Sequence, residues 1–169
     1  MLLYAMRSAA GDTLLFHSST VVKDGKAYLF LGKSGTGKST HSGLWLKHIG
    51  GTRLLNDDNP VVYISHEGTP MVSGSPWSGK TPCYRKESMT VGAFVRLEQA
   101  PQNEIEQERA AHAFATLLPS CSCLKPETRK SITPLSTTVT ELATLAPVYH
   151  LKCLPDREAT ELCRKTVEG

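Results

Sequence analysis

The residues with the clearest chemical meaning form a glycine-rich segment that could hold phosphate groups. Eight consecutive residues match the pattern Gly-x-x-x-x-Gly-Lys-Ser/Thr in full. Glycines let successive backbone N–H groups turn toward an anion, which a β-carbon would obstruct. With the residue that follows it, the segment is predicted to bind a nucleotide through Gly32, Lys33, Ser34, Gly35, Thr36, Gly37, Lys38, Ser39 and Thr40.

Two side chains of this segment have individual roles in the expected chemistry. Lys38 is placed to reach the β- and γ-phosphates, and the Ser39 hydroxyl can coordinate Mg²⁺. The alternative to a phosphate-binding role is a glycine-rich turn that matches the pattern by chance. An apolar strand pattern before the segment and a helical pattern after it favour purine-nucleotide binding, with ATP and Mg²⁺ as the expected ligands.

Two adjacent carboxylates follow soon after the glycine-rich segment. Asp57 and Asp58 end a predicted strand at residues 53–56, only one helix and one turn beyond Lys38. One carboxylate could bind Mg²⁺ while the other acts as a base toward an acceptor hydroxyl. A solvated turn is the alternative, because the stretch from Asn56 to Pro60 is also favourable turn chemistry. Beside a phosphate-binding segment, the catalytic interpretation is favoured.

The elements that must position these residues can be predicted from the apolar pattern. Residues 13–22 are predicted to be extended, and Asp24-Gly25 indicates a type I′ hairpin turn into a buried strand at residues 27–31. A helix is predicted at residues 39–48. A hairpin that leads into the glycine-rich segment predicts a mixed or antiparallel sheet, unlike the parallel sheet of common doubly wound folds.

The rest of the chain continues to alternate between strands and helices. Further strands are predicted at residues 53–56, 61–65, 71–73, 91–97 and 148–153, and helices at residues 108–118, around 139–145, and at 156–166 with Asp156 as the cap. No repeat or linker divides the 169 residues. The expected organisation is one domain over residues 1–169, with a recognisable core at about 13–154 and a closing helix at 156–166.

Composition excludes several classes of protein. The net charge is +3, from 19 basic and 16 acidic residues that are dispersed along the chain, so nucleic-acid binding is not expected. No apolar run is long enough for a membrane span, and the N-terminus does not resemble a secretory signal. The five cysteines lack metal-site spacing, which indicates reduced thiols in a cytoplasmic protein.

The order of these features resembles a known family. A strand bearing His17, a hairpin, a phosphate-binding segment, a helix and a strand ending in Asp57-Asp58 together resemble the catalytic domain of HPr kinase/phosphorylase, whose fold is related to phosphoenolpyruvate carboxykinase. The resemblance covers roughly residues 13–62, and residues 74–82 look like the matching segment of small HPr kinase-related proteins. It implies an α/β fold with a mixed sheet around a nucleotide-binding core that uses ATP and Mg²⁺.

The resemblance also implies roles for individual residues. Asp57 would match the general base on the acceptor, and Ser39 and Asp58 would match the Mg²⁺ ligands. His17 would match a histidine that faces the active site and, with Asp57 and Lys38, would belong to the catalytic residues. A purely structural histidine is the alternative for His17.

Two further cationic side chains could contact the phosphate or the acceptor from the opposite side of the site, as a clamp. Lys80 and Arg85 follow the segment around Trp77, and phosphoryl transfer depends mainly on positioning and charge stabilisation. The alternative is a proline-anchored loop with an exposed lysine.

The function expected from all of these features is an ATP-dependent phosphotransferase that moves the γ-phosphate to a hydroxyl. The glycine-rich signature segment with which HPr kinases engage their protein substrate is not recognisable after Leu97, so a protein or peptide serine and a small molecule both stay open as acceptor. A non-catalytic ATP-binding regulatory module of the same fold is the alternative function. Homo-oligomers are common in the family, which leaves a homo-oligomer open here.

Overall fold

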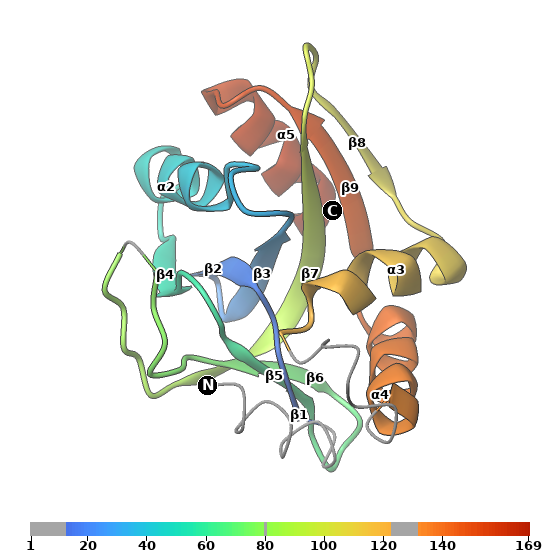
Figure 1. The fold of residues 1–169 in the computed structure, drawn as a ribbon. Coiled ribbons are helices and arrows are strands. Elements are labelled where there is room, and N and C mark those ends of the chain that lie inside the picture. The colour runs from blue at the N-terminus through green and yellow to red at the C-terminus, as the bar shows by residue number, and fades with distance from the viewer. Residues whose placement is uncertain (1–12, 80, 123–131) are drawn as a thin grey trace.

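The computed structural model describes residues 13–79, 81–122 and 132–169, in which nine strands form one mixed sheet (Figure 1). The strands are β1 Thr13–Leu15, β2 Ser18–Lys23, β3 Lys26–Leu31, β4 Arg53–Asn56, β5 Val61–Ile64, β6 Pro70–Ser73, β7 Ser88–Gln99, β8 Glu104–Gln107 and β9 Val148–Cys153. The helices are α2 Lys38–His48, α3 Ala110–Leu117, α4 Ile132–Leu145 and α5 Arg157–Glu168, with a short 3₁₀ turn η2 at Leu118–Ser120. The mixed sheet that the sequence predicts is confirmed.

The predicted hairpin connects β2 to β3. Asp24 and Gly25 both have positive φ, 48° and 77°, as a type I′ turn requires. β2 pairs in antiparallel fashion with β3 on one side and with β4 on the other. β3 and β4 therefore run in the same direction, and their carboxyl ends meet the start of β2 at one edge of the sheet.

A parallel block continues the sheet on the other side of β3. The twelve-residue β7 pairs in parallel with β3 and with β9, and Arg96 lies opposite Leu31 in the first pair. The carboxyl end of β7 thus lies at the same edge as that of β3. The pairing therefore brings the carboxyl ends of β3, β4 and β7, which are distant in sequence, to the same edge of the sheet.

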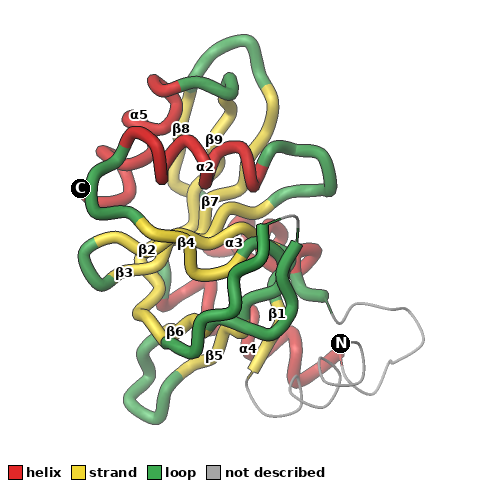
Figure 2. Tube along the Cα trace, turned by 90° about the vertical axis from the view of Figure 1, so that its left-hand side faces the viewer, coloured by secondary structure: helices red, strands yellow, loops and turns green. Residues whose placement is uncertain are grey.

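Helices cover both faces of the sheet (Figures 1 and 2). α2 and α5 pack on one face, where Trp45 and Cys163 belong to a buried cluster with Phe30. On the other face α3 and α4 cover a second cluster that contains Leu29 and Leu31, because successive side chains of a strand point to opposite faces. None of the helices in the described part of the chain has the length and apolarity to span a bilayer.

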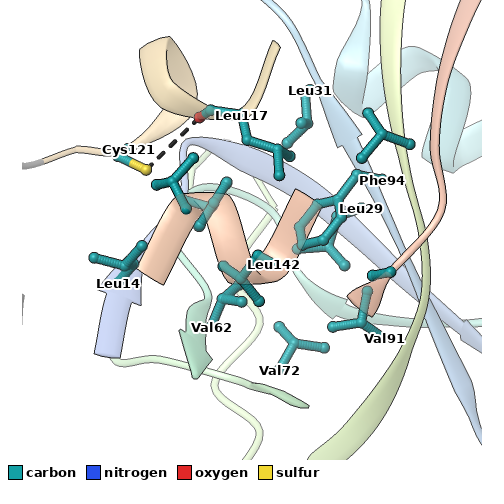
Figure 3. Close-up of a cluster of buried hydrophobic side chains, with 14 of the residues drawn as sticks. Leu14, Leu29, Leu31, Val62, Val72, Val91, Phe94, Leu117, Cys121 and Leu142 are labelled. Atoms are coloured by element: carbon teal, nitrogen blue, oxygen red, sulfur yellow. Dashed lines mark hydrogen bonds between the residues drawn. The ribbon is translucent and has the colours of Figure 1, made fainter. Parts of the chain in front are cut away.

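The cluster beneath α4 packs this helix against the sheet. Figure 3 shows Leu142 of α4 among side chains of β1, β5 and β6, including Leu14 and Val62. At the margin of the cluster, the buried Cys121 thiol donates to the carbonyl oxygen of Leu117 at the end of α3. α3, α4 and the first strands thereby form one packed unit.

Two differences from the predicted elements have physical causes. The extended stretch 13–22 is interrupted at residues 16 and 17, because β1 pairs with β5 whereas β2 pairs with β3 and β4. β8 was not predicted at all. Its sequence, Glu-Ile-Glu-Gln, has low strand propensity, and the strand exists because it pairs with β9 at the border of the sheet.

The predicted helices are confirmed with shifted bounds. The helix predicted at 108–118 begins at Ala110, and the one predicted around 139–145 extends back to Ile132. The expected cap of the last helix is confirmed, since the Asp156 carboxylate accepts a hydrogen bond of 2.8 Å from the Ala159 N–H.

The buried imidazole of His41 predicts an acid-sensitive fold. His41 packs 4.7 Å from the Phe30 ring and accepts a hydrogen bond from Trp45 Nε1 at Nε2, 3.2 Å away. Burial lowers the pKa of His41 from 6.5 to about 4. As the pH falls, His41 is therefore protonated in the unfolded chain before it is protonated in the folded protein. This difference alone lowers the free energy of unfolding by about 3 kcal/mol between pH 7 and pH 4.

Urea unfolding at both pH values measures this effect. His41→Gln, which keeps an acceptor for Trp45, should lose markedly less stability than the wild type over the same interval. Equal losses in the two proteins would contradict the assignment to His41.

Candidate functional site

The glycine-rich loop, residues 32–37, connects β3 to α2 at the edge where the strand ends meet. Gly35 and Gly37 have φ values of 84° and 104°, in the left-handed region that favours glycine. Inside the loop, the Thr36 hydroxyl donates to the carbonyl oxygen of Lys33 at 2.7 Å. The loop therefore folds back on itself at the beginning of the helix.

The N-terminus of α2 has the properties of an anion site. Gly37 is the capping residue and offers no side-chain acceptor, and the first turn of the helix contains no acidic residue. The N–H groups of that turn lie at the positive end of the helix dipole. Ser39 and Thr40 both lie in this turn and are exposed. The arrangement is suited to a phosphate group.

Lys38 bends back over the loop. Its Nζ donates to the carbonyl oxygen of Gly32 at 2.9 Å and to that of Lys33 at 3.2 Å. Burial lowers the pKa of Lys38, while the negative charges of Asp58 and Asp57 oppose that shift. The ammonium group and both carboxylates thus lie within electrostatic reach of one another.

Asp57 ends a buried chain of hydroxyl groups, here called the hydroxyl chain, which consists of Ser42, Ser19 and Asp57. The Ser19 hydroxyl donates to Asp57 Oδ1 at 2.7 Å and lies 2.6 Å from the Ser42 oxygen. The single Ser19 proton goes to Asp57, and the Ser42 hydroxyl beside it also lies within hydrogen-bond distance of the carbonyl oxygens of Lys38 and Ser39 in its own helix. The chain connects α2, β2 and the end of β4. Asp57 Oδ2 is buried and has no hydrogen-bond partner among the described residues.

Asn56 holds the backbone at Asp58. Its Oδ1 accepts from the backbone N–H of Asp58 at 2.9 Å, and its Nδ2 donates to the Ser75 hydroxyl and to the carbonyl oxygen of Trp77. The same segment passes so close to the strand end that a β-carbon on Gly79 would lie 2.5 Å from the carbonyl oxygen of Asp57. The fully buried Asn56 amide thereby holds residues 75–79 against the two aspartates.

His17 lies between β1 and β2, beside this cluster. Its backbone N–H donates to the carbonyl oxygen of Ser120 at 2.7 Å. Burial and the positive charge of Lys38 lower the pKa of the imidazole, and Asp58 opposes the shift. A lowered pKa keeps His17 neutral at pH 7, so the ring can serve as a hydrogen-bonding group rather than as a fixed charge.

A cavity of about 800 Å³ opens beside the glycine-rich loop. His17 and residues 32–36 border it on one side, and Arg96, Glu108 and His112 border it on the other. Arg96, Glu108 and His112 were not predicted from the sequence as site residues. The sequence feature that could have identified this side of the cavity is Arg96, a cation within the otherwise apolar strand pattern of residues 91–97.

The proposed clamp residues are not brought to this cluster by the described contacts. Lys80 lies outside the described residues. Arg85 is half exposed, and its guanidinium lies 4.0 Å from the Glu87 carboxylate. Glu87 also contacts Arg53, at the start of β4 and thus at the opposite end of the strand from Asp57. A clamp role for Lys80 and Arg85 stays a prediction.

The donor set fits Mg²⁺ better than a metal held by protein alone. Within the described residues, no group of three or more His, Cys, Asp or Glu side chains could hold a metal ion. Mg²⁺ normally binds to one or two carboxylates together with phosphate oxygens and water. Asp58 and the Ser39 hydroxyl are the groups that could supply such ligands, and Asp57 has a buried oxygen without a partner among the described residues.

Comparison with known proteins gives a distant likeness in fold. The chain is similar to the solved structure of the HPr(Ser) kinase/phosphatase from Coxiella burnetii, with a TM-score of 0.52 and 14% sequence identity over 91% of this chain and 88% of that one. No protein-family model and no curated protein sequence matches this chain. At this identity the likeness shows the fold alone, a mixed α/β architecture of the kind that the sequence resemblance implies.

The His17 environment makes a prediction for its titration. The imidazole should titrate below pH 6.5 in the wild type, because burial and Lys38 disfavour its protonated form. Lys38→Met should raise the midpoint and Asp58→Asn should lower it further, which NMR of the imidazole protons can measure. If neither substitution changes the titration midpoint of His17, the imidazole does not face these charges.

The close approach at Gly79 makes a prediction for stability. Gly79→Ala should cost about 1–3 kcal/mol of unfolding free energy, because the added methyl group meets the backbone oxygen of Asp57 and the two segments must separate. Gly50→Ala is a matched control, since a β-carbon there meets no described atom within 4 Å. Denaturant unfolding of both variants distinguishes them, and equal stability would contradict the contact.

Proposed function

We propose that this protein is an ATP-dependent kinase that transfers the γ-phosphate to a hydroxyl. The observation that carries the proposal is Asp57, whose buried Oδ2 is left without a partner beside Lys38 and the glycine-rich loop. An orphaned buried carboxylate oxygen is costly for folding, which favours a functional reason for its position. The fold likeness to a solved structure named as a kinase/phosphatase supports the same class of activity.

The chain's own groups suffice to hold a triphosphate. The glycine-rich loop and the first turn of α2 offer backbone N–H groups, and Lys38 can leave its two carbonyl partners for the β- and γ-phosphates. Asp58 and Ser39 would hold Mg²⁺, which would neutralise charge that develops on the phosphates. Neutral His17 would donate or accept a hydrogen bond at the transferred group.

The two oxygens of Asp57 have different roles in the proposed transfer step. The acceptor oxygen attacks the γ-phosphorus, its proton passes to Asp57 Oδ2, and the bond from the γ-phosphorus to the bridging oxygen breaks to release ADP. Oδ1 is already engaged by the Ser19 hydroxyl at 2.7 Å. The hydroxyl chain therefore orients the carboxylate so that Oδ2 is the oxygen left to receive the proton.

Transfer of label from γ-labelled ATP tests this role. With Mg²⁺ and a cell extract as the source of acceptors, the wild type should label a species that Asp57→Asn does not, a loss of at least about 100-fold since proton transfer to a positioned base contributes that much. Asp57→Asn should still bind Mg-ATP, whereas Lys38→Ala should bind it poorly. Asp24→Asn, in the exposed hairpin turn, is the matched control and should keep full activity.

Two outcomes would contradict the proposal in different ways. Full transfer by Asp57→Asn would show that Asp57 is not the base. Thermal stabilisation of the wild type by Mg-ATP with no label transferred to any species would instead favour the non-catalytic nucleotide-binding module.

A further inference from the structure

The cavity beside the glycine-rich loop adjoins the residues proposed to bind the nucleotide. It borders His17 and residues 32–36, and no described residue of α2 lines it. His17 lies within electrostatic reach of Lys38 and Asp58, the groups proposed to face the terminal phosphates. Residues 32–36 are also the proposed nucleotide-binding residues, so a second molecule would occupy the part of the cavity bordered by Arg96 and Glu108 and would adjoin the bound phosphates.

The far wall of the cavity contains a partly satisfied ion pair. Arg96 Nη2 lies 3.3 Å from Glu108 Oε1 and 2.9 Å from His150 Nδ1, and His150 Nε2 lies 2.8 Å from the Glu98 carboxylate. The Glu108 side chain is only 7% exposed, yet its Oε2 has no hydrogen-bond partner among the described residues. Arg96 Nε is likewise buried and unpartnered within that part of the chain.

These two orphaned groups have complementary requirements. Glu108 Oε2 can only accept a hydrogen bond and Arg96 Nε can only donate one. A ligand that satisfies both must present a donor and an acceptor close together. The Arg96 side chain is 38% exposed, and its guanidinium has to rotate away from Glu108 for such a group to reach both atoms.

On the basis of the proposed kinase function, we propose that this cavity binds the acceptor and that the acceptor is a small hydroxy amino acid. Once the Arg96 guanidinium has rotated, the ammonium group donates to Glu108 Oε2 and the carboxylate accepts from Arg96 Nε. The hydroxyl then extends past His17 toward Asp57, the proposed base. A concave volume of about 800 Å³ is typical of small-molecule sites, whereas a protein acceptor would be expected to use a flatter surface.

Binding of simple compounds to the wild-type chain tests the proposal without any substitution. Calorimetry in the presence of Mg-ADP should detect L-serine or L-threonine. Ethanolamine, which lacks the carboxylate, and glycerate, which lacks the amino group, should each bind at least about tenfold more weakly, because each leaves one charged partner unpaired. Equal affinity for all four compounds would overturn the proposal. Tighter binding of a short serine-containing peptide than of free serine would also overturn it, in favour of a peptide acceptor.

Substitutions assign the recognition to particular residues. Glu108→Gln and Arg96→Lys should each weaken binding of the hydroxy amino acid by about tenfold and leave the affinity for Mg-ADP unchanged. Glu104→Gln is the matched control, because that carboxylate lies on β8, is 66% exposed and does not line this cavity. Unchanged amino-acid binding in both cavity variants would overturn the proposal.

The same measurements separate this inference from the proposed function. If the wild type does not bind Mg-ADP, the nucleotide site and with it the kinase proposal fail. If Mg-ADP binds but neither serine nor threonine does, only the assignment of the acceptor fails.

Discussion

The arrangement of the site depends on one buried interaction, the hydroxyl chain that links Ser42 through Ser19 to Asp57. A buried carboxylate is tolerated only where hydrogen bonds replace its lost hydration. Asp57 obtains its hydrogen bond from a strand, β2, whose serine is in turn hydrogen-bonded to helix α2. The helix that begins at the glycine-rich loop and the strand end that bears the carboxylate are therefore fixed relative to each other through a third element.

Topology makes this interaction geometrically accessible. Since β2 runs antiparallel to both β3 and β4, it brings its own first residues to the carboxyl ends of its two neighbours. The parallel pairing of β3 with β7 adds the end of β7 to the same edge. Ligands in open α/β sheets bind beyond the carboxyl ends of strands, and the candidate site and its adjoining cavity both follow that rule.

Local signals in the sequence predicted much of this architecture. Asp24-Gly25 predicts the hairpin because both residues tolerate positive φ, and the apolar patterns on either side of the loop predict β3 and α2. Contacts that depend on strand register were not predictable. Ser19, Asn56 and Arg96 are a serine, an amide and a cation within strand patterns, and only the folded structure reveals their partners, Asp57, the Trp77 carbonyl oxygen and His150. β8 escaped prediction for the same reason, because its partner strand lies 41 residues further along the chain at Val148.

An irregularity in β2 joins the twist of the sheet to the geometry of the site. The register between β2 and β4 shifts between Thr20 and Val21, next to the residues that support Asp57. Such irregularities increase the local twist, and neighbouring strands are already rotated by about 20–25°. Because β2 separates β3 from β4, that rotation accumulates over two strand pairs before it reaches the carboxylates. The twist of the sheet and the hydroxyl chain therefore act together on the angle at which Asp57 meets the loop.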